Sequence, residues 1–478
     1  MIGLLVLLFC VLLLVGGYCL YGRLAERIYG ADPHAPMPCD THHDGVDYVR
    51  LPTWKVFLIQ LLNIAGLGPV FGALAGCLFG PVALLWIVIG CIFAGAMHDF
   101  LAALMSAEQG GANLPELIGR YLGRGAKYAL RIICIFLLLL VGAVFTTGPA
   151  GMLHAMAGGI SVTGWCAIIL GYYLLATILP INAIIGKIYP LFGLLFLFMT
   201  LGLAIALPAS GYEILPNLDF FTNVQPQGLP VWPMIFVTIA CGAISGFHAT
   251  QSPMMVRCLG SARLMRPVFY GAMITEGLVA LIWATIGLTL RDVVMNAPAA
   301  CDASVSFMQL TLSSPAAAVN RACVLLLGNT GALLAVLGVV VLPITSGDTA
   351  MRSCRLMLAA ATGLNQQNLV KRLVIALPLF ALVILISQLN FGIIWRYFGW
   401  SNQVLSCLTL WSIAVCLHSK RRLHWIATLP ALFMTCMCTT YLLFSPDCLI
   451  ELPLHLSTFI GAAAALICLV LFLRKRSS

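Results

Sequence analysis

Charged side chains are scarce in this 478-residue chain: Asp, Glu, Lys and Arg make up 9% of it, whereas 61% is hydrophobic. A soluble globular protein carries about 25% charged residues, so the composition excludes that class. No loop is long enough to form a separate soluble domain. We therefore expect an all-α integral membrane protein whose helices form a single unit spanning residues 1–478.

Several motifs are also missing. There is no Gly-Lys-Ser/Thr loop of the P-loop type, which argues against ATP hydrolysis. The 18 cysteines lack disulfide or zinc spacing. The loop cluster His34, Cys39, His42, His43 and Asp44 fits no standard zinc pattern. We expect solvated loop polarity there, and no metal or other cofactor.

Apolar runs are abundant instead. A membrane-spanning helix needs roughly 20 residues, and thirteen runs come close to or exceed that length. They are 2–20, 55–77, 80–106, 128–149, 162–180, 187–207, 233–257, 267–290, 317–345 or 317–358, 373–388, 400–418, 424–444 and 456–473. The first run lacks the charged start and cleavage site of a secretory signal, so we interpret it as a retained transmembrane helix.

The basic residues predict the orientation of these runs. With the N-terminus outside, all but three of the 25 Lys and Arg residues fall in loops on the cytoplasmic side; the exceptions are Arg291, Arg321 and Arg396. Cytoplasmic loops are the ones enriched in Lys and Arg. This favours thirteen spans with the N-terminus outside and the C-terminus inside a cytoplasmic membrane. It also explains the net charge of +9 without nucleic-acid binding.

The run 55–77 contains residues that interrupt a helix. Gly66, Gly68 and Pro69 lie at its centre, and Pro69 lacks the N–H that a helix interior needs. In lipid, an unpaired backbone group persists only where protein or a water-filled cavity covers it. The pattern predicts a broken helix at mid-membrane whose backbone approaches a substrate.

A second interruption occurs in the run 233–257, at Ser245, Gly246 and His248. It lies five helices after the first and enters from the opposite side. Paired breaks of opposite orientation indicate an inverted-repeat transporter, with repeats 55–207 and 233–418, an extra helix 2–20 and two extra helices in 424–473. The alternative is that these glycines only allow close helix packing.

Three stretches carry a resemblance to a known family. They are Ile239-Ala240-Cys241-Gly242-Ala243-Ile244-Ser245-Gly246-Phe247-His248, Gly95-Ala96-Met97-His98-Asp99-Phe100 and Gly399-Trp400-Ser401-Asn402-Gln403. The chain resembles the carbon starvation protein A (CstA) family. The resemblance implies peptide or pyruvate uptake under nutrient limitation and a LeuT-like fold of the amino acid–polyamine–organocation type. The chain is shorter than the longest members.

Ionisable residues inside a membrane are functional candidates by default. His98, Asp99 and Glu276 are candidates for proton coupling, with an Asp99–arginine pair and a protonated structural Glu276 as the alternatives. His248 follows the second break, where a half-helix end attracts a carboxylate. We expect it to contact the substrate, unless a neighbouring carbonyl satisfies it.

Two further pairs are weaker candidates. Ser346 and Asp348 have the oxygen ligands for a coupling cation, although Asp348 can instead pair with Arg352 at i+4. Asn402 and Gln403 open the run 400–418 and are candidates for a substrate gate, with a helix N-cap beginning at Ser401 as the alternative.

The sequence therefore predicts a secondary active transporter for a small carboxylate: a peptide, pyruvate or an amino acid. The ionisable residues favour H+ over Na+ as the coupling ion. The alternatives are an intramembrane enzyme acting on a lipid or peptide, and a nutrient sensor. The oligomeric state stays open.

Overall fold

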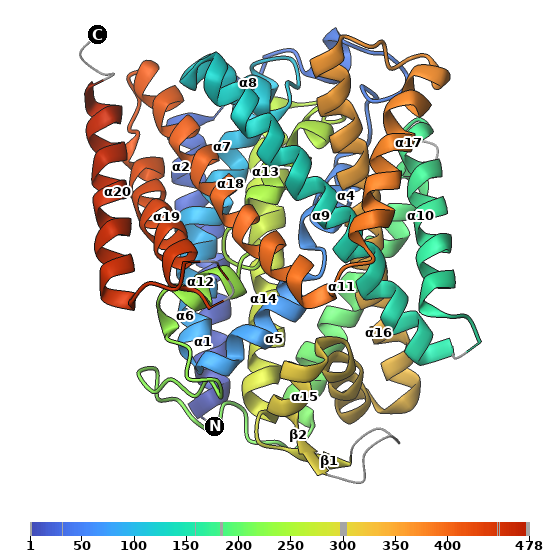
Figure 1. Cartoon of the computed structure of the whole chain (residues 1–478), viewed down its shortest axis with the longest axis vertical. Coiled ribbons are helices and arrows are strands. Elements are labelled where there is room, and N and C mark those ends of the chain that lie inside the picture. The colour runs from blue at the N-terminus through green and yellow to red at the C-terminus, as the bar shows by residue number, and fades with distance from the viewer. Residues whose placement is uncertain are drawn as a thin grey trace.

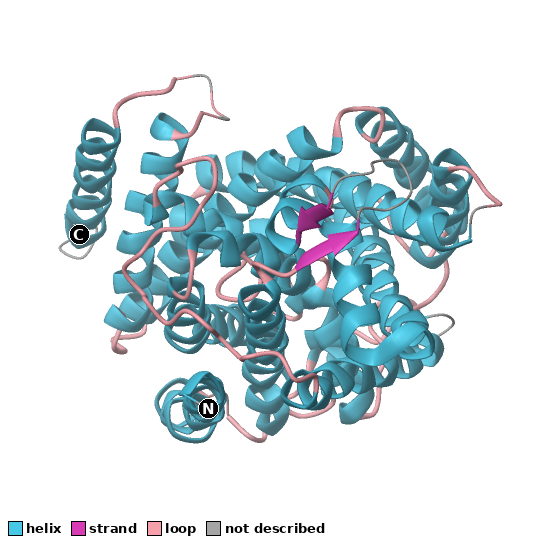
Figure 2. Ribbon diagram, turned by 90° about the horizontal axis from the view of Figure 1, so that it is seen from below, coloured by secondary structure: helices cyan, strands magenta, loops and turns pink. Residues whose placement is uncertain are grey.

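The computed structural model describes residues 2–30, 32–157, 159–181, 185–296, 304–446, 448 and 450–474. Helices build nearly all of this part of the chain (Figure 1). One antiparallel hairpin, β1 (Val294–Asn296) with β2 (Ser304–Ser306), lies at one end of the bundle beside the short helix α15 (Phe307–Ser313), as Figure 2 shows. The described chain is therefore an all-α bundle with a small β-cap.

Within the described residues, ten helices are long and apolar enough to cross a membrane. They are Ile2–Tyr29, Val82–Ala107, Arg124–His154 within α9 (Arg124–Ala157), α11 (Ile185–Ala209), Ala262–Leu290 (ending in α14, Gly271–Leu290), Gly331–Thr362 within α16 (Pro315–Thr362), α17 (Leu369–Ile386), α18 (Phe391–Ser419), α19 (Trp425–Phe444) and α20 (Leu454–Arg474). The bent pair Thr53–Ala65 and Gly68–Phe79 makes an eleventh if it is counted as one span.

The other two predicted runs are also helical but shorter. They are α10 (Val162–Ile178), and the pair α12 (Val231–Thr238) and α13 (Gly246–Val256). Two predicted boundaries were wrong by nine residues. The first helix continues to Tyr29, nine residues past the predicted end, because an amphipathic turn follows the apolar run. The run predicted to start at 400 starts at Phe391, where Asn390 caps the helix.

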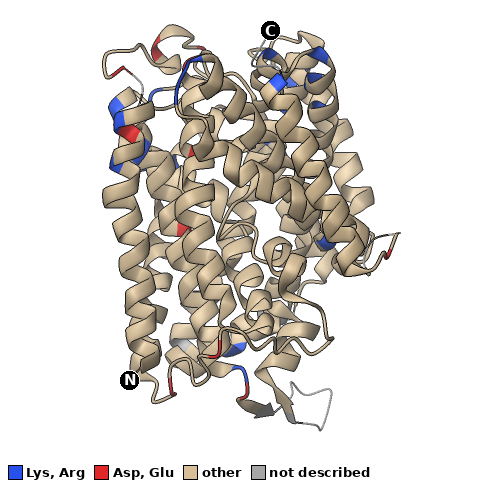
Figure 3. Cartoon of the chain, turned by 90° about the vertical axis from the view of Figure 1, so that its left-hand side faces the viewer, with Lys and Arg blue, Asp and Glu red and all other residues tan. Residues whose placement is uncertain are grey.

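The helices differ in how deeply they are buried. Val82–Ala107 and Ala262–Leu290 are largely covered by other helices, whereas Ile2–Tyr29 and α20 expose most of their surface. The two termini lie at opposite ends of the bundle (Figure 1). Lys and Arg gather mainly at the end that carries the C-terminus (Figure 3), as the charge pattern of the sequence predicts.

The first break is confirmed. Helix α4 (Thr53–Ala65) ends at Gly66, which adopts φ 45° and ψ −145°, a conformation that glycine tolerates. The chain resumes as a π-helical turn, η2 (Gly68–Gly72), and the two halves are bent by 53°. Pro69 lies in the first turn of η2, where its missing N–H leaves no helical bond unmade.

The second break is confirmed as well, since residues 239–245 between α12 and α13 are not helical. The two broken helices run in opposite directions, because the chain just before α4 meets the chain just after α13: the Leu51 N–H donates to the Cys258 carbonyl at 3.0 Å. The breaks also touch. A Cβ placed on Gly68 would lie 2.4 Å from the Cys241 sulfur, so glycine is needed for this approach.

Candidate functional site

Four ionisable side chains form a continuous buried network at the second break. His98 and Asp99 lie on α7 (Ala96–Ala107), His248 on α13 and Glu276 on α14. The Asp99 carboxylate accepts a hydrogen bond from Nδ1 of His98 at 2.8 Å and from Nδ1 of His248 at 2.9 Å. The other ring nitrogen of His248, Nε2, lies 3.5 Å from Oε2 of Glu276. All four side chains are fully buried.

The balance of charge explains how these groups coexist in a low-dielectric interior. Two carboxylates placed together in an apolar core would repel each other and lose hydration. Two imidazoles between and beside them can carry compensating protons, and histidine changes its charge near neutral pH. The ring of His248 therefore links the Asp99 and Glu276 carboxylates, one through each of its nitrogens.

The structure changes two of the sequence interpretations. The alternative in which Asp99 pairs with an arginine is wrong, because the two histidines are its partners. The alternative in which a carbonyl satisfies His248 is wrong too, since carboxylates flank its ring. Sequence reasoning treated His248 as separate from the other three residues because nothing in the order of the helices places α13 against α7.

Asn402 and Gln403 hold the two half-helices of the second break. Oδ1 of Asn402 accepts hydrogen bonds from the Phe247 N–H at 2.7 Å and the Ser245 hydroxyl at 3.1 Å. Nε2 of Gln403 donates to the Phe236 carbonyl at 2.6 Å. The N-cap alternative for the run 400–418 was wrong, because both residues lie inside α18. They satisfy backbone groups that the break leaves unpaired.

The first break faces α16. The Ser346 hydroxyl donates to the Leu62 carbonyl at 2.7 Å, and Gly66 lies against Ser346 and the ring of Phe145. Asp348 is buried two residues on, where the Tyr172 and Tyr189 hydroxyls face its carboxylate, although neither contact has good hydrogen-bond geometry. Its proposed pairing with Arg352 was wrong, because that guanidinium points to another carboxylate.

That carboxylate is Asp47, in the loop before α4. Nη1 of Arg352 lies 2.8 Å from its Oδ1, and Nη2 of Arg355 lies 3.4 Å from its Oδ2. Burial by itself would raise the pKa of Asp47, but Arg355, Arg352 and Arg257 outweigh it and hold the pKa below its ordinary value. The cluster ties the loop to α16 at the end of the bundle where α4 starts.

Sequence reasoning missed two polar residues beside the first break. Gln60 and Asn63 lie on α4, three residues apart and within the turns before Gly66, and both are fully buried. None of their four side-chain polar atoms has a hydrogen-bond partner. The signal was present as two amides in an apolar run. Buried amides without partners are costly, so they mark a place where an external group would bind.

The network is closed to solvent in this structure. Two apolar grooves, of about 570 and 980 Å³, lie elsewhere, the first beside Trp86 and Phe433 and the second beside Phe57 and Leu194. No residue of the network lines either groove. A ligand reaches the breaks only if the helices around them move.

A bundle of membrane-length helices, with two broken helices meeting beside a buried ionisable network, is the architecture of a multi-pass membrane transporter. The chain belongs to the family described as carbon starvation protein CstA, which matches residues 2–163 and 149–326. The resemblance found in the sequence motifs is thereby confirmed.

Two relatives of this chain carry the names of transporters. The peptide transporter CstA of Escherichia coli is 25% identical over 90% of this chain and 80% of its own length. The pyruvate/proton symporter BtsT of the same organism is 25% identical, over 55% of this chain and 46% of its own length. An uncharacterized membrane protein of Haemophilus influenzae is 42% identical over 64% of this chain and 96% of its own length.

Solved structures show the same fold. A manganese transporter from Eremococcus coleocola superposes with a TM-score of 0.52 at 14% identity, covering 90% of this chain and 97% of that one. The likeness therefore concerns the arrangement of the helices.

Proposed function

We propose that this protein is a proton-coupled secondary active transporter that takes up a small carboxylate, namely a peptide, pyruvate or an amino acid, during carbon starvation. It would work in the bacterial cytoplasmic membrane with its N-terminus outside and its C-terminus inside. The names of the relatives support this class of substrate. The observation that carries the proposal is the buried connection from Asp99 through His248 to Glu276.

The substrate would bind between the two breaks. The N-terminal end of α13 attracts a carboxylate through its backbone N–H groups and helix dipole. On α4, before the first break, the amides of Gln60 and Asn63 offer donors and acceptors that no protein group uses. Gly68 lets the two breaks approach each other, and Gly66 brings the first break close to Ser346.

Coupling would follow from the network. A proton taken up at Glu276 or Asp99 removes a buried negative charge and changes which partner His248 holds. Because His248 belongs to a half-helix of the break, this change is transmitted to the substrate site. If 55–207 and 233–418 are inverted repeats, the four-helix bundle that contains both breaks would then rock against the remaining helices and open the closed site to alternate sides.

Proteoliposomes test the proposal directly. With the outside acidic, radiolabelled pyruvate or a dipeptide is expected to accumulate in the vesicles, and a protonophore is expected to abolish the accumulation. Glu276→Gln is expected to lose proton-driven uptake, whereas Glu213→Gln, which changes an exposed loop carboxylate, should retain it. Uptake that needs a Na+ gradient and ignores the protonophore would contradict proton coupling.

The same preparation separates the other classes. An intramembrane enzyme would form a product in detergent, where no compartments exist. A sensor would bind its ligand without moving it across the bilayer. The names of the relatives favour transport over both.

A further inference from the structure

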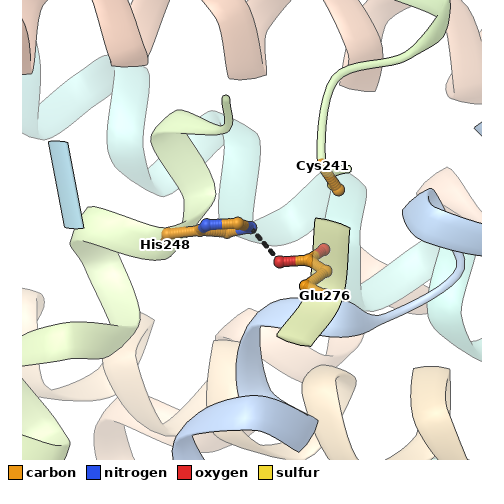
Figure 4. Close-up of side chains that lie close together, drawn as sticks. All are labelled: Cys241, His248 and Glu276. Carbon is orange, nitrogen blue, oxygen red and sulfur yellow. Dashed lines mark ion pairs between the residues drawn. The ribbon is translucent and has the colours of Figure 1, made fainter. Parts of the chain in front are cut away.

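One end of the buried network has the composition of a metal site. Sγ of Cys241, Nε2 of His248 and a carboxylate oxygen of Glu276 all lie within 4.8 Å of one another, and all three side chains are buried (Figure 4). Cys241 comes from the non-helical connection of the second break, His248 from α13 and Glu276 from the middle of α14. Three separate elements therefore point ligand atoms at one spot.

We propose that Cys241, His248 and Glu276 bind one divalent metal ion of the zinc class. Thiolate and imidazole ligands select borderline and soft ions such as Zn²⁺, and a carboxylate completes sites of this kind. Three protein ligands leave one position of a tetrahedron open for water or an external oxygen donor.

The distances suit this ion. Bonds of about 2.0–2.3 Å around tetrahedral zinc place neighbouring ligand atoms about 3.3–3.8 Å apart. His248 Nε2 and Glu276 Oε2 are already 3.5 Å apart. The Cys241 sulfur lies within 4.8 Å of the other two ligand atoms. It would have to move about 1 Å closer to them to bind the same ion, and a rotation of the Cys241 side chain can supply that movement.

Unused polar atoms point to the same place. Nε2 of His248 and Oε2 of Glu276 face each other as an ion pair at 3.5 Å, but neither they nor the second Glu276 oxygen makes a hydrogen bond. Buried polar groups are normally paired, and each exception calls for an unseen partner such as an ion. A thiolate and a carboxylate together carry two negative charges, so a divalent ion would neutralise the site.

Asp99 makes the hydrogen bond to His248 that metal-binding histidines usually have on their second ring nitrogen. Its carboxylate accepts a hydrogen bond from Nδ1 of His248 at 2.9 Å, which leaves Nε2 as the free lone pair on the side of Cys241 and Glu276. Metal-ligating histidines almost always donate their second N–H to a carboxylate or carbonyl in this way. Asp99 is thus a positioning residue for the proposed site.

Cobalt tests the site without any transport measurement. The full-length protein in detergent, stripped with a chelator, is titrated with Co²⁺, whose bond to a thiolate gives a near-ultraviolet charge-transfer band. We expect one Co²⁺ per chain with this band. The band should vanish in Cys241→Ser and persist in Cys323→Ser, a matched buried cysteine outside the cluster. Asp99→Asn should weaken Co²⁺ binding by about 10–100-fold.

X-ray absorption of the Zn²⁺-loaded wild type needs no variant, so it remains decisive if Cys241→Ser misfolds. One sulfur neighbour at about 2.3 Å with nitrogen and oxygen neighbours at about 2.0–2.2 Å is expected. A shell without sulfur, or a cobalt band that survives in Cys241→Ser, would overturn the proposal. A bound ion would occupy Nε2 of His248 and the Glu276 carboxylate, so the ion and a relayed proton would compete for these atoms. Both measurements omit substrate and proton gradient, so metal binding can fail while the transport proposal stands.

Discussion

His248 lies between two carboxylates, with Nδ1 2.9 Å from Asp99 Oδ2 and Nε2 3.5 Å from Glu276 Oε2. An imidazole in this position is flanked on both nitrogens by groups able to take its protons. Because its helix begins at the second break, protonation and the geometry of the break are mechanically linked. Each residue around it can therefore be tested for a separate contribution.

Asp99→Asn is expected to abolish proton-driven accumulation. The amide keeps the size of the side chain but removes the negative charge that both histidines face. Exchange of labelled substrate across vesicles without a gradient should survive better than accumulation, since exchange needs no net proton movement. Equal loss of both activities would mean that Asp99 only maintains the fold.

Asn63→Ala is expected to weaken substrate binding with little loss of stability. Its amide has no hydrogen-bond partner in the protein, so its removal leaves no other buried group unpaired. Asn402→Ala is the matched comparison. It deprives Phe247 N–H and the Ser245 hydroxyl of their acceptor, and the loss of such a cap costs about 1 kcal/mol.

Thermal unfolding in detergent, with and without substrate, separates these two variants. Asn63→Ala should melt at the wild-type temperature alone but gain less from added substrate, because binding stabilises by mass action. Asn402→Ala should melt lower in both conditions. If substrate raises the melting temperature of Asn63→Ala as much as that of the wild type, Asn63 does not contact the substrate.

Gly68→Ala is expected to block transport. A methyl group there would lie 2.3 Å from Cβ and 2.4 Å from Sγ of Cys241, and overpacking of this kind typically costs about 1–3 kcal/mol. The two breaks would be forced apart. Gly151→Ala on α9 is the control, since its added Cβ meets nothing within 4 Å. Uptake assays in vesicles should find the control active; an active Gly68→Ala would show that the breaks need not touch.

Asp47→Asn is expected to destabilise the protein by about 3–5 kcal/mol, since it leaves the buried Arg352 and Arg355 guanidinium groups without their carboxylate. The folded-state pKa of Asp47 is lowered from 3.8. Its contribution is therefore fully present above about pH 4 and is lost as the pH falls through the lower, folded value.

Unfolding of the wild type and Asp47→Asn across pH 3–8 checks the direction of this pH dependence. The difference between their free energies of unfolding should be constant from pH 5 to 8 and shrink towards pH 3. Glu213→Gln serves as the exposed control and should show no difference. A gap that widens on acidification would contradict the lowered pKa.

Much of the fold could be predicted because the bilayer allows few backbone structures. Apolar runs of about 20 residues had to be helices, because a segment of that length satisfies its own backbone groups in lipid only as a helix. Gly66, Gly68 and Pro69 had to interrupt one of them. Boundaries were less predictable. The helix that contains Asn402 begins nine residues before Trp400. The polar residues around Ser401 are buried inside the protein, so the helix passes through them without interruption.

The sequence by itself determined that this is a multi-pass membrane protein, where two of its helices break, and which few ionisable residues lie within the membrane-length runs. Local composition and backbone chemistry are sufficient for these features. Only the tertiary structure decided that Asn402 and Gln403 clamp the second break, that Arg352 holds Asp47, and that Asp99, His248 and Glu276 share one site. These contacts join residues more than a hundred positions apart or on different helices, and only helix packing brings them together.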